Sequence, residues 1–171
     1  DTELVNLQNS ILNGEVVTRE PAYYAGGTAA AHSGQDWGNT YAEVDMSAQH
    51  MWYVQNGQVV LETDVVTGEP IPSKITPEGV YSLMWKQPNS VLVGDINPDT
   101  GEPAYRTKVK YWMQVTSSGV GFHDATWQTA FGGTLYQIPG TGSHGCINMP
   151  LDQAGALFNM IEPGTPVIFH W

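Results

Sequence analysis

The chain has one cysteine, Cys146, in a segment whose residue types favour nucleophilic chemistry. A cysteine attacks as a thiolate, so its free pKa of about 8.5 must be lowered by a cation, a paired histidine or a helix N-terminus. His144 lies two residues before the cysteine, His123 lies further upstream, and Pro150 opens a predicted helix just beyond it. We therefore predict that Cys146 is a nucleophile activated by a nearby histidine.

A glycine-rich turn and a helix are the elements that must position this cysteine. Gly142 and Gly145 allow a tight bend that presents backbone N–H groups, which can stabilise an oxyanion. The run 150–161 is typical of a helix, because it has a proline at its start, Asp152 in its first turn and an apolar face. The apolar positions of that face are Ala154, Leu157, Phe158 and Ile161.

Two plainer interpretations of the same residues stay open at this point. A lone cysteine is most often a small buried hydrophobic residue. Alternatively, His123, His144 and Cys146 could bind zinc, which takes His and Cys ligands. A structural zinc ion usually has four protein ligands, whereas this chain offers one thiol. The nucleophile is therefore the favoured interpretation.

The segment Ser143–Asn148 resembles the catalytic motif of the L,D-transpeptidase (YkuD-like) family. In that motif an upstream His is followed by Ser/Thr-His-Gly-Cys, a hydrophobic residue and Asn or Arg, and the segment fits it without a mismatch. The aromatic run 111–113 upstream of His-Asp-Ala-x-Trp is similar to the Gram-positive version of the family. The resemblance covers about residues 39 to 171, and its other marks are Gln49, Asn56-Gly57 and Thr76-Pro77-Glu78-Gly79.

The resemblance implies a mainly β (β-rich α+β) fold: a sandwich of two mixed sheets, with one short helix after the cysteine loop and a lid insertion. Composition agrees, because 11 Pro, 19 Gly and many β-branched and aromatic residues are typical of a β-rich domain. Residues 39–171 are expected to form the catalytic domain. Residues 1–38 are expected to be a linker or the tail of a preceding module.

Alternating apolar and polar residues predict most of the strands. Asn56-Gly57 between two such runs is the strongest short signal for a hairpin. The segment 86–110 is irregular and predicts a long loop, either a lid over the substrate cleft or a plain solvated loop. The other predicted strands cover residues 41–46, 80–85, 109–115, 119–123 and 166–171.

Three histidines without a sequence neighbour of catalytic type are expected to be structural or surface residues. These are His32, His50 and His170.

The resemblance assigns a role to each residue of the motif. His123 takes the thiol proton, and the main-chain carbonyl of Asp124 orients the imidazole. The Asp124 carboxylate is expected to point away, because consecutive side chains on a strand face opposite sides. His144 and Gly145, with the amide of Cys146, are assigned to the oxyanion hole.

A further group is expected to contact substrate or to border the groove. Trp127 is the preferred groove residue, while Ser143 and Asn148 are expected mainly to hold the loop in shape. The remaining candidates are Tyr105, Arg106 and Lys108 in the lid, together with Tyr111 and Trp112.

The implied activity is formation of 3→3 cross-links between peptidoglycan stem tetrapeptides, through a cysteine thioester and with release of D-Ala. Carbapenems are expected to acylate the same sulfur, and neither a metal nor an organic cofactor is needed. The alternatives are an L,D-carboxypeptidase that uses the same site, and a non-catalytic wall-binding module that stacks sugars on Trp85, Trp112 and Trp127. A papain-like peptidase fits less well, because its Cys usually precedes its His.

The net charge of −11 argues against nucleic acid and anionic membrane as partners, because it repels phosphate groups. A monomer is expected. The sequence begins at Asp1, so we expect a trimmed piece of a longer protein. By the resemblance it acts at the extracellular face of the bacterial membrane or in the wall, anchored or secreted through a segment outside this sequence.

Overall fold

The computed structural model describes residues 9–10, 12–13 and 37–171. The chain divides after Gly38, and the architecture below is that of the unit Asn39–Trp171. The predicted linker or preceding module at residues 1–38 lies mostly outside the described residues, so it stays a prediction. Among the residues that the structure describes, no helix is long and apolar enough to span a membrane.

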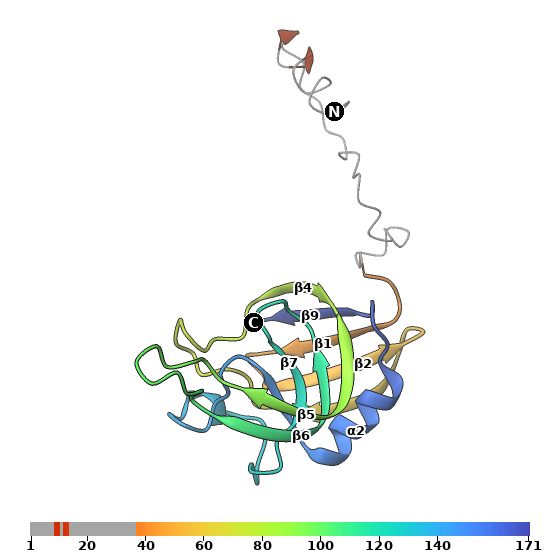
Figure 1. Cartoon of the computed structure of the whole chain (residues 1–171). Coiled ribbons are helices and arrows are strands. Elements are labelled where there is room, and N and C mark those ends of the chain that lie inside the picture. Colours follow the sequence, from red (N-terminus) through yellow and green to blue (C-terminus); the bar gives the residue numbers. More distant parts are fainter. Residues whose placement is uncertain (1–8, 11, 14–36) are drawn as a thin grey trace. The chain divides into compact units, whose positions relative to one another are not determined.

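Two mixed sheets form the body of this unit, as the sequence predicted (Figure 1). The first has the strand order β3-β2-β1-β9-β4, with β1 and β9 parallel and the other pairs antiparallel. Its strands are β1 (Tyr41–Asp45), β2 (His50–Gln55), β3 (Gln58–Asp64), β4 (Gly79–Ser82) and β9 (Pro166–His170).

The second sheet has the order β5-β6-β7-β8, with β7 and β8 parallel. Its strands are β5 (Trp85–Val93), β6 (Arg106–Gln114), β7 (Gly121–Asp124) and β8 (Ile147–Met149). A short 3-10 helix, η1 (Leu135–Gln137), lies in the connection from β7 to β8.

The hairpin of β2 and β3 turns at Asn56-Gly57, as predicted. Both residues have positive φ, 54° and 79°. A two-residue hairpin turn of this kind needs left-handed conformations, which Asn and Gly adopt at low cost.

The core lies where the inner faces of the sheets meet helix α2 (Leu151–Met160). The helix packs against β6, β7 and β3. Its predicted apolar face is buried at Ala154, Leu157 and Ile161, whereas Phe158 is only partly buried. Pro150 is the N-cap of the helix, one position earlier than predicted.

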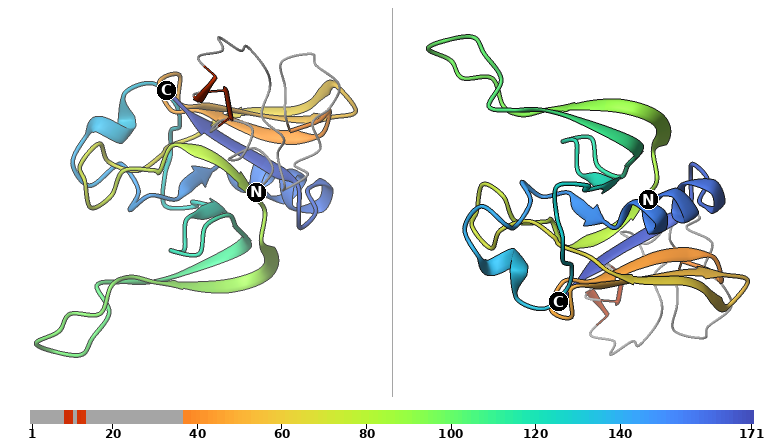
Figure 2. Two further views of the ribbon diagram at one scale, coloured as in Figure 1. Left: turned by 90° about the horizontal axis from the view of Figure 1, so that it is seen from above. Right: turned by 90° about the horizontal axis from the view of Figure 1, so that it is seen from below.

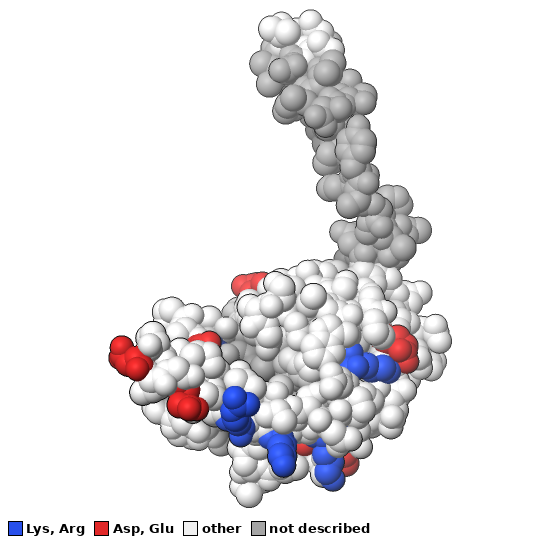
Figure 3. Space-filling view, viewed as in Figure 1, with Lys and Arg blue, Asp and Glu red and all other residues white. Residues whose placement is uncertain are grey.

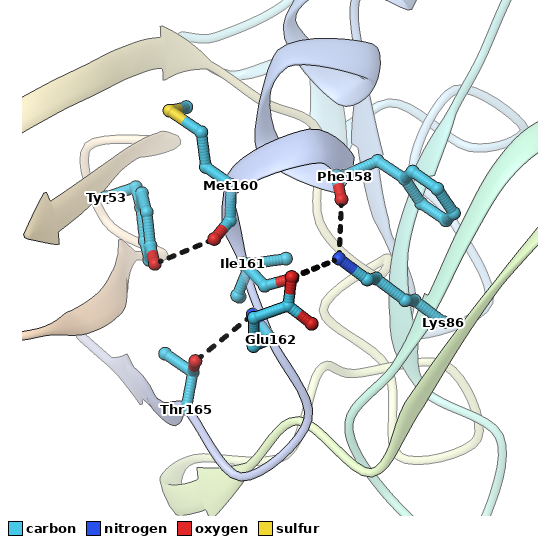
Figure 4. A network of polar contacts seen from close by, with 7 residues as sticks. All are labelled: Tyr53, Lys86, Phe158, Met160, Ile161, Glu162 and Thr165. Atoms are coloured by element: carbon cyan, nitrogen blue, oxygen red, sulfur yellow. Dashed lines mark hydrogen bonds and ion pairs between the residues drawn. The ribbon is translucent and has the colours of Figure 1, made fainter.

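The C-terminus of α2 is capped by side chains from distant strands (Figure 4). The last carbonyls of a helix have no partner within the helix. Lys86 Nζ donates to the carbonyls of Phe158 at 3.0 Å and Ile161 at 2.7 Å, and it also pairs with Glu162 at 3.0 Å. Tyr53 donates its hydroxyl to the carbonyl of Met160 at 3.4 Å. The start of β5 is thereby tied to the end of the helix.

The prediction of a long loop at 86–110 is wrong. β5 and β6 form a long antiparallel hairpin with its tip at residues 94–105, and Figure 2 shows it extending away from the rest of the unit. Pro88 is tolerated because β5 is an edge strand, where a missing N–H removes no ladder bond. Asn89 has φ 54°, and it and the opposite Lys110 interrupt the ladder, whose register is the same on both sides.

The predicted core strand 80–85 is also wrong. β4 ends at Ser82 in one sheet and β5 begins at Trp85 in the other, with Leu83 buried between them. Val80 is 59% exposed. An apolar run can therefore cross from one sheet to the next, which periodicity alone does not reveal.

Candidate active site

The parallel pairing of β7 with β8 brings the predicted catalytic residues to one face. His123 pairs with Asn148, and their neighbours Phe122, Ile147 and Met149 point into the core. Because side chains alternate along a strand, Cys146 lies on the same side as Asn148 and therefore as His123. Cys146 is one strand across and two residues along from His123, so about 8 Å separates their backbones. Two side chains on one face can span that distance.

His123 is buried and held in one orientation. Its Nδ1 lies 3.0 Å from the Asp124 carbonyl. A carbonyl only accepts, so Nδ1 carries the proton and Nε2 is left as a base. The ring packs between the rings of Trp112 and Trp127, with centroids 6.0 and 5.8 Å away. Burial lowers the pKa of His123, against the opposing effects of the carbonyl and the Asp124 charge.

The carboxylate of Asp124 faces away from the imidazole. Its Oδ1 accepts the backbone N–H groups of Lys110 and Tyr111, each at 2.8 Å. The ladder between β6 and β7 ends one step earlier, at the pair Trp112 and His123. The carboxylate therefore accepts hydrogen bonds from β6 at the point where β6 no longer pairs with β7 and continues into the hairpin. One residue orients His123 through its carbonyl and holds β6 through its side chain.

Cys146 differs from the sequence expectation in its acid–base state. Burial raises the pKa of its thiol to about 11, and a hydrogen bond from the Gly121 backbone only partly opposes this. The helix cannot lower it, because strand β8 separates Cys146 from the start of α2. The thiol donates to the carbonyl of Gly119 at 3.5 Å. The resting pair is therefore a neutral thiol and a neutral imidazole, and the side chain of Cys146 remains partly exposed to a cavity.

The loop before Cys146 is shaped by Ser143. Its hydroxyl donates to the Cys146 carbonyl at 2.6 Å and accepts the Gly145 N–H at 3.0 Å. The Gly145 amide assigned to the oxyanion hole is therefore occupied, and Gly145 instead supplies a left-handed turn with φ 115°. Among the described residues, the backbone N–H groups of His144 and Cys146 have no acceptor. These two amides are available to an oxyanion.

A second segment, residues 66–76, holds this loop through hydrogen bonds. Buried Thr76 donates its hydroxyl to the Gly145 carbonyl at 2.8 Å and accepts the Gly68 N–H at 3.0 Å. Glu69 accepts from the Gly140 N–H at 3.0 Å and pairs with Lys74 at 2.9 Å. These bonds, led by the one from Lys74, lower the pKa of Glu69. Sequence reasoning noticed the Thr-Pro turn without connecting it to the site.

The site opens into a cavity of about 470 Å³. The predicted residues Tyr105, Trp127, Ser143, His144 and Asn148 line it together with His123 and Cys146. The ring of Tyr105, from the hairpin, lies 5.2 Å from that of His144. Burial raises the pKa of Tyr105, and at the alkaline pH where this tyrosine ionises the negative charges of Cys146 and Asp95 add to the rise. The hairpin therefore does contribute a wall of the cavity, as a lid would.

Four predicted groove residues lie elsewhere. Tyr111 packs on Phe158 of α2, because the missing side chain of Gly155 leaves room for its ring. Trp112 is buried behind His123, and Arg106 and Lys108 are exposed outside the cavity.

Sequence reasoning missed several lining residues, among them Leu92, Thr107 and Gln128. Gln128 accepts a hydrogen bond from Asn148 and donates to the Thr141 carbonyl at 3.4 Å. The Thr141 carbonyl only accepts, so it faces the amide nitrogen of Gln128, and the Gln128 oxygen accepts from the amide nitrogen of Asn148. Asn148 Oδ1 is then buried without a partner among the described residues.

The alternative of a metal site finds no support in the described residues. Within the described ranges, no three His, Cys, Asp or Glu side chains converge as metal ligands would. Two of the remaining histidines make structural pairs, His50 with Asp64 at 2.7 Å and His170 with Glu43 at 3.0 Å. His32 lies outside the described residues.

Comparisons with known proteins agree with this geometry. The family model of the L,D-transpeptidase catalytic domain (YkuD) matches residues 39–169. A curated relative, L,D-transpeptidase 1 of Mycobacterium tuberculosis, is 30% identical over 71% of this chain and 47% of its own length. A crystal structure of a cysteine-to-serine mutant of the Enterococcus faecium L,D-transpeptidase is 42% identical, with a TM-score of 0.72, over 99% of this chain and 64% of that one.

A third similar protein is the catalytic domain of the E. faecium enzyme acylated by ertapenem. It is 46% identical, with a TM-score of 0.65, over 77% of this chain and 97% of that one. The chain spans 47% of the mycobacterial relative and 64% of the E. faecium crystal structure, less than two thirds of either.

Proposed function

The chain belongs to the family of L,D-transpeptidase catalytic domains, and on that premise we propose that Cys146 takes an acyl group from a peptidoglycan stem peptide. The observation that carries the proposal is the arrangement of His123. Its Nδ1 is fixed by the Asp124 carbonyl at 3.0 Å, which leaves Nε2 free on the face that holds Cys146. Both side chains open into one cavity.

In the first half of the reaction, His123 Nε2 removes the thiol proton while the sulfur attacks a carbonyl carbon of the donor stem. The thiol must first turn from the Gly119 carbonyl towards the imidazole. The carbonyl oxygen gains negative charge under the N–H groups of His144 and Cys146. When the C–N bond breaks, the leaving amine of D-Ala takes the proton from Nε2, and a thioester remains on Cys146.

In the second half, the amine of another stem attacks the thioester. His123 removes a proton from that amine, the C–S bond breaks, and the sulfur recovers its proton. The product is a 3→3 cross-link between two stem peptides. Amides held in advance, as here by Ser143 and Thr76, cost no reorganisation when the charge appears. Removing one such donor typically slows an enzyme about 10²- to 10³-fold.

Covalent inhibitors fit the same scheme. The E. faecium domain carries an ertapenem acyl group, and a similar solved structure is a carbamoyl enzyme formed with avibactam. We propose that Cys146 is acylated by carbapenems in the same way. We further propose a monomer that acts at the extracellular face of the bacterial membrane or in the wall.

Intact-mass spectrometry after addition of a carbapenem tests the proposal. Wild type should gain the mass of one inhibitor molecule, and Cys146→Ala should gain none. The protein is then incubated with disaccharide-tetrapeptide, and the products are searched for a dimer that has lost one D-Ala. Adduct with tripeptide but no dimer would mean that water resolves the thioester. No adduct at all would refute catalysis at Cys146.

A further inference from the structure

Proton transfer from Cys146 leaves a buried positive charge on His123. When Nε2 takes the thiol proton, the S–H bond breaks, an N–H bond forms and the imidazole becomes an imidazolium. The His123 side chain is only 3% exposed, and burial disfavours the charged form of a histidine. Neighbouring groups must therefore stabilise this charge until the proton passes to the leaving amine.

The polar groups around His123 do not offset its burial. In a catalytic triad, a carboxylate against the imidazole stabilises the imidazolium. Here the Asp124 carboxylate faces away and accepts two backbone N–H groups of β6. The Asp124 carbonyl and charge raise the His123 pKa, yet burial lowers it by more.

The described residues that line the cavity include no Lys, Arg, Asp or Glu. The other titratable groups of the lining are Tyr105, His144 and Cys146. The residue paired with His123 on β8 is Asn148, which does not titrate. Figure 3 shows the charged side chains of one face of the molecule, spread over the outer surface. No charged side chain of the lining is therefore available to the imidazolium.

Two tryptophans pack against the His123 ring instead. Trp112 is paired with His123 across β6 and β7, and its ring centroid lies 6.0 Å away with the planes inclined by 35°. The centroid of Trp127 lies 5.8 Å away with the planes inclined by 33°. A cation is attracted to the electron-rich face of an indole at centroid distances up to about 6 Å, and most strongly where water is excluded.

On the basis of the proposed function, we infer that Trp112 and Trp127 stabilise the His123 imidazolium by cation–π attraction, in the role that a carboxylate has in a triad. Both act through His123, so they are positioning residues. A neutral ring stabilises the cation without forming an ion pair with it. Nε2 can therefore pass its proton on to the leaving amine.

The local sequence holds the Trp112 ring beside His123. A Cβ at Gly121 would lie 2.9 Å from this ring, so the glycine leaves the room that the indole fills. Trp85 packs edge-on against the indole, with the centroids 6.4 Å apart. Trp112 is 4% exposed, so its contact with His123 is shielded from water.

A turn folds Trp127 back towards His123, four residues upstream. The Ala125 carbonyl accepts the Gln128 N–H at 3.0 Å, which closes a turn with Trp127 in its third position. The Gln128 side chain is itself held by Asn148 and by a main-chain carbonyl. Trp127 is 52% exposed and lines the cavity, so its attraction for the cation should be the weaker of the two.

An indole that served only as apolar cover would have the opposite effect on the His123 pKa. Apolar cover excludes water and lowers the pKa, so losing it raises the pKa. Cation–π attraction favours the imidazolium and raises the pKa, so weakening it lowers the pKa. The sign of the change therefore separates the two roles.

The test weakens the electrostatics of one ring at a time while nearly keeping its shape. Tryptophan with one to four fluorine atoms is placed at position 112, 127 or 85 of the whole chain by nonsense suppression. Fluorine withdraws electrons from the face of the ring, which weakens its attraction for a cation. Trp85 is the matched control, because it packs on Trp112 rather than on His123.

The His123 pKa is read in the resting protein by NMR of ¹⁵N-labelled histidine rings, and His123→Gln identifies the signal. We expect the pKa to fall with each added fluorine. Four fluorines should lower it by about 1 pH unit at Trp112 and by about 0.5 at Trp127. Trp127→Leu, which keeps apolar cover without a π face, should lower it as well. Fluorination of Trp85 should not change it.

Three results would overturn the inference. These are a His123 pKa that ignores fluorine at both positions, a pKa that rises, and a His123 that stays neutral in wild type until acid unfolds the protein. The NMR titration needs no turnover, so it decides the role of the indoles whether or not the protein is acylated.

Single-turnover acylation by a carbapenem is followed against pH in the same proteins. Its acid limb should move to lower pH together with the measured pKa. The level from pH 7 to 9 should fall by up to about 10-fold per pH unit, because a less basic imidazole is a weaker general base. No adduct in wild type would refute the proposed function. Normal acylation with a fluorine-independent pKa would refute only the role of the indoles.

Discussion

The acid–base state of Cys146 gives the sharpest prediction of this structure. Burial raises the thiol pKa from an ordinary 9.0 to about 11, and burial lowers the pKa of His123. Both shifts favour the uncharged form of the group concerned. The resting site therefore holds a thiol and a neutral imidazole, and His123 must act as a general base during attack.

The expected size of the effect follows from the pKa difference. At pH 8 a thiol of pKa 9 is about 10% ionised and one of pKa 11 about 0.1%, a ratio of about 100. A thiolate of higher pKa is intrinsically more nucleophilic, which returns about 10-fold over two pKa units. Cys146 should therefore react with iodoacetamide about 10-fold more slowly than a free thiol at this pH. Slow alkylation is thus compatible with catalysis.

The assay is a titration of thiolate absorbance in the ultraviolet, as the difference between wild type and Cys146→Ala. The chain has one cysteine, so a thiolate signal in the difference comes from Cys146, and both proteins carry Tyr105→Phe because the charge of Cys146 shifts the pKa of that tyrosine. We expect no thiolate signal from pH 6 to 9 and a rise towards pH 11. His123→Ala should leave the neutral region unchanged. A thiolate signal at pH 6 that disappears in His123→Ala would show an ion pair and refute the reasoning.

The same shifts predict how stability and rate depend on pH. Above pH 9 the unfolded chain releases the Cys146 proton before the folded one does, so stability is lost from pH 9 to 11. At pH 10 this amounts to about 1 kcal/mol, and Cys146→Ala should remove it. Below pH 6.5 the unfolded chain protonates His123 first, so stability falls as pH falls towards the lower folded pKa. Carbapenem acylation by the folded protein should stay level from pH 7 to 9 and should fall only near the lowered pKa of His123, below 6.5.

Three further predictions concern residues that hold the site. Asp124→Ala leaves two backbone N–H groups of β6 without an acceptor and should cost about 2–4 kcal/mol in chemical denaturation. Asp124→Asn keeps an acceptor and should retain most acylation activity, whereas the Asp→Asn change in a catalytic triad costs about 10⁴-fold. Thr76→Val unpairs the Gly145 carbonyl and should slow single-turnover acylation with a stability loss of about 1–3 kcal/mol; an unchanged rate would show that this bond does not position the loop. Lys86→Met removes the cap of α2 and should cost about 2–3 kcal/mol, whereas Glu162→Gln should cost less than about 1 kcal/mol because that carboxylate is mostly exposed. Equal losses in these last two variants would contradict the capping role.

Local sequence signals predicted the parts of the fold that local physics decides. The Asn56-Gly57 hairpin and helix α2 each depend on a few adjacent residues, and both were predicted. The β-sandwich and the lid insertion were expected from the resemblance to the family, and local signals did not predict them. The β5–β6 hairpin was missed because Pro88 reads as a strand breaker, and its tolerance depends on β5 being an edge strand. Whether a strand lies at an edge depends on the strand order of the whole sheet, so the residues of the segment alone do not reveal it.

The candidate site shows the same division. The neighbouring residues Tyr111 and Trp112 were both expected at the groove, although alternation on a strand sends them to opposite sides, towards α2 and behind His123. The helix N-terminus was expected to lower the Cys146 pKa, and the intervening strand β8 removes that influence. The support from Thr76 crosses between segments far apart in the chain. No spacing rule predicts such a contact.

The core itself therefore sets the catalytic geometry. His123 and Cys146 share a face because Phe122 and Ile147, one position away on each strand, are fully buried on the other face. A slip of β8 by one residue against β7 would turn Ile147 out of the core and Cys146 into it, so core packing fixes the catalytic register. The imidazole, the available amides and the loop are likewise held by main-chain groups and buried hydroxyls. With so few charges in the site, the neutral resting pair is the expected state.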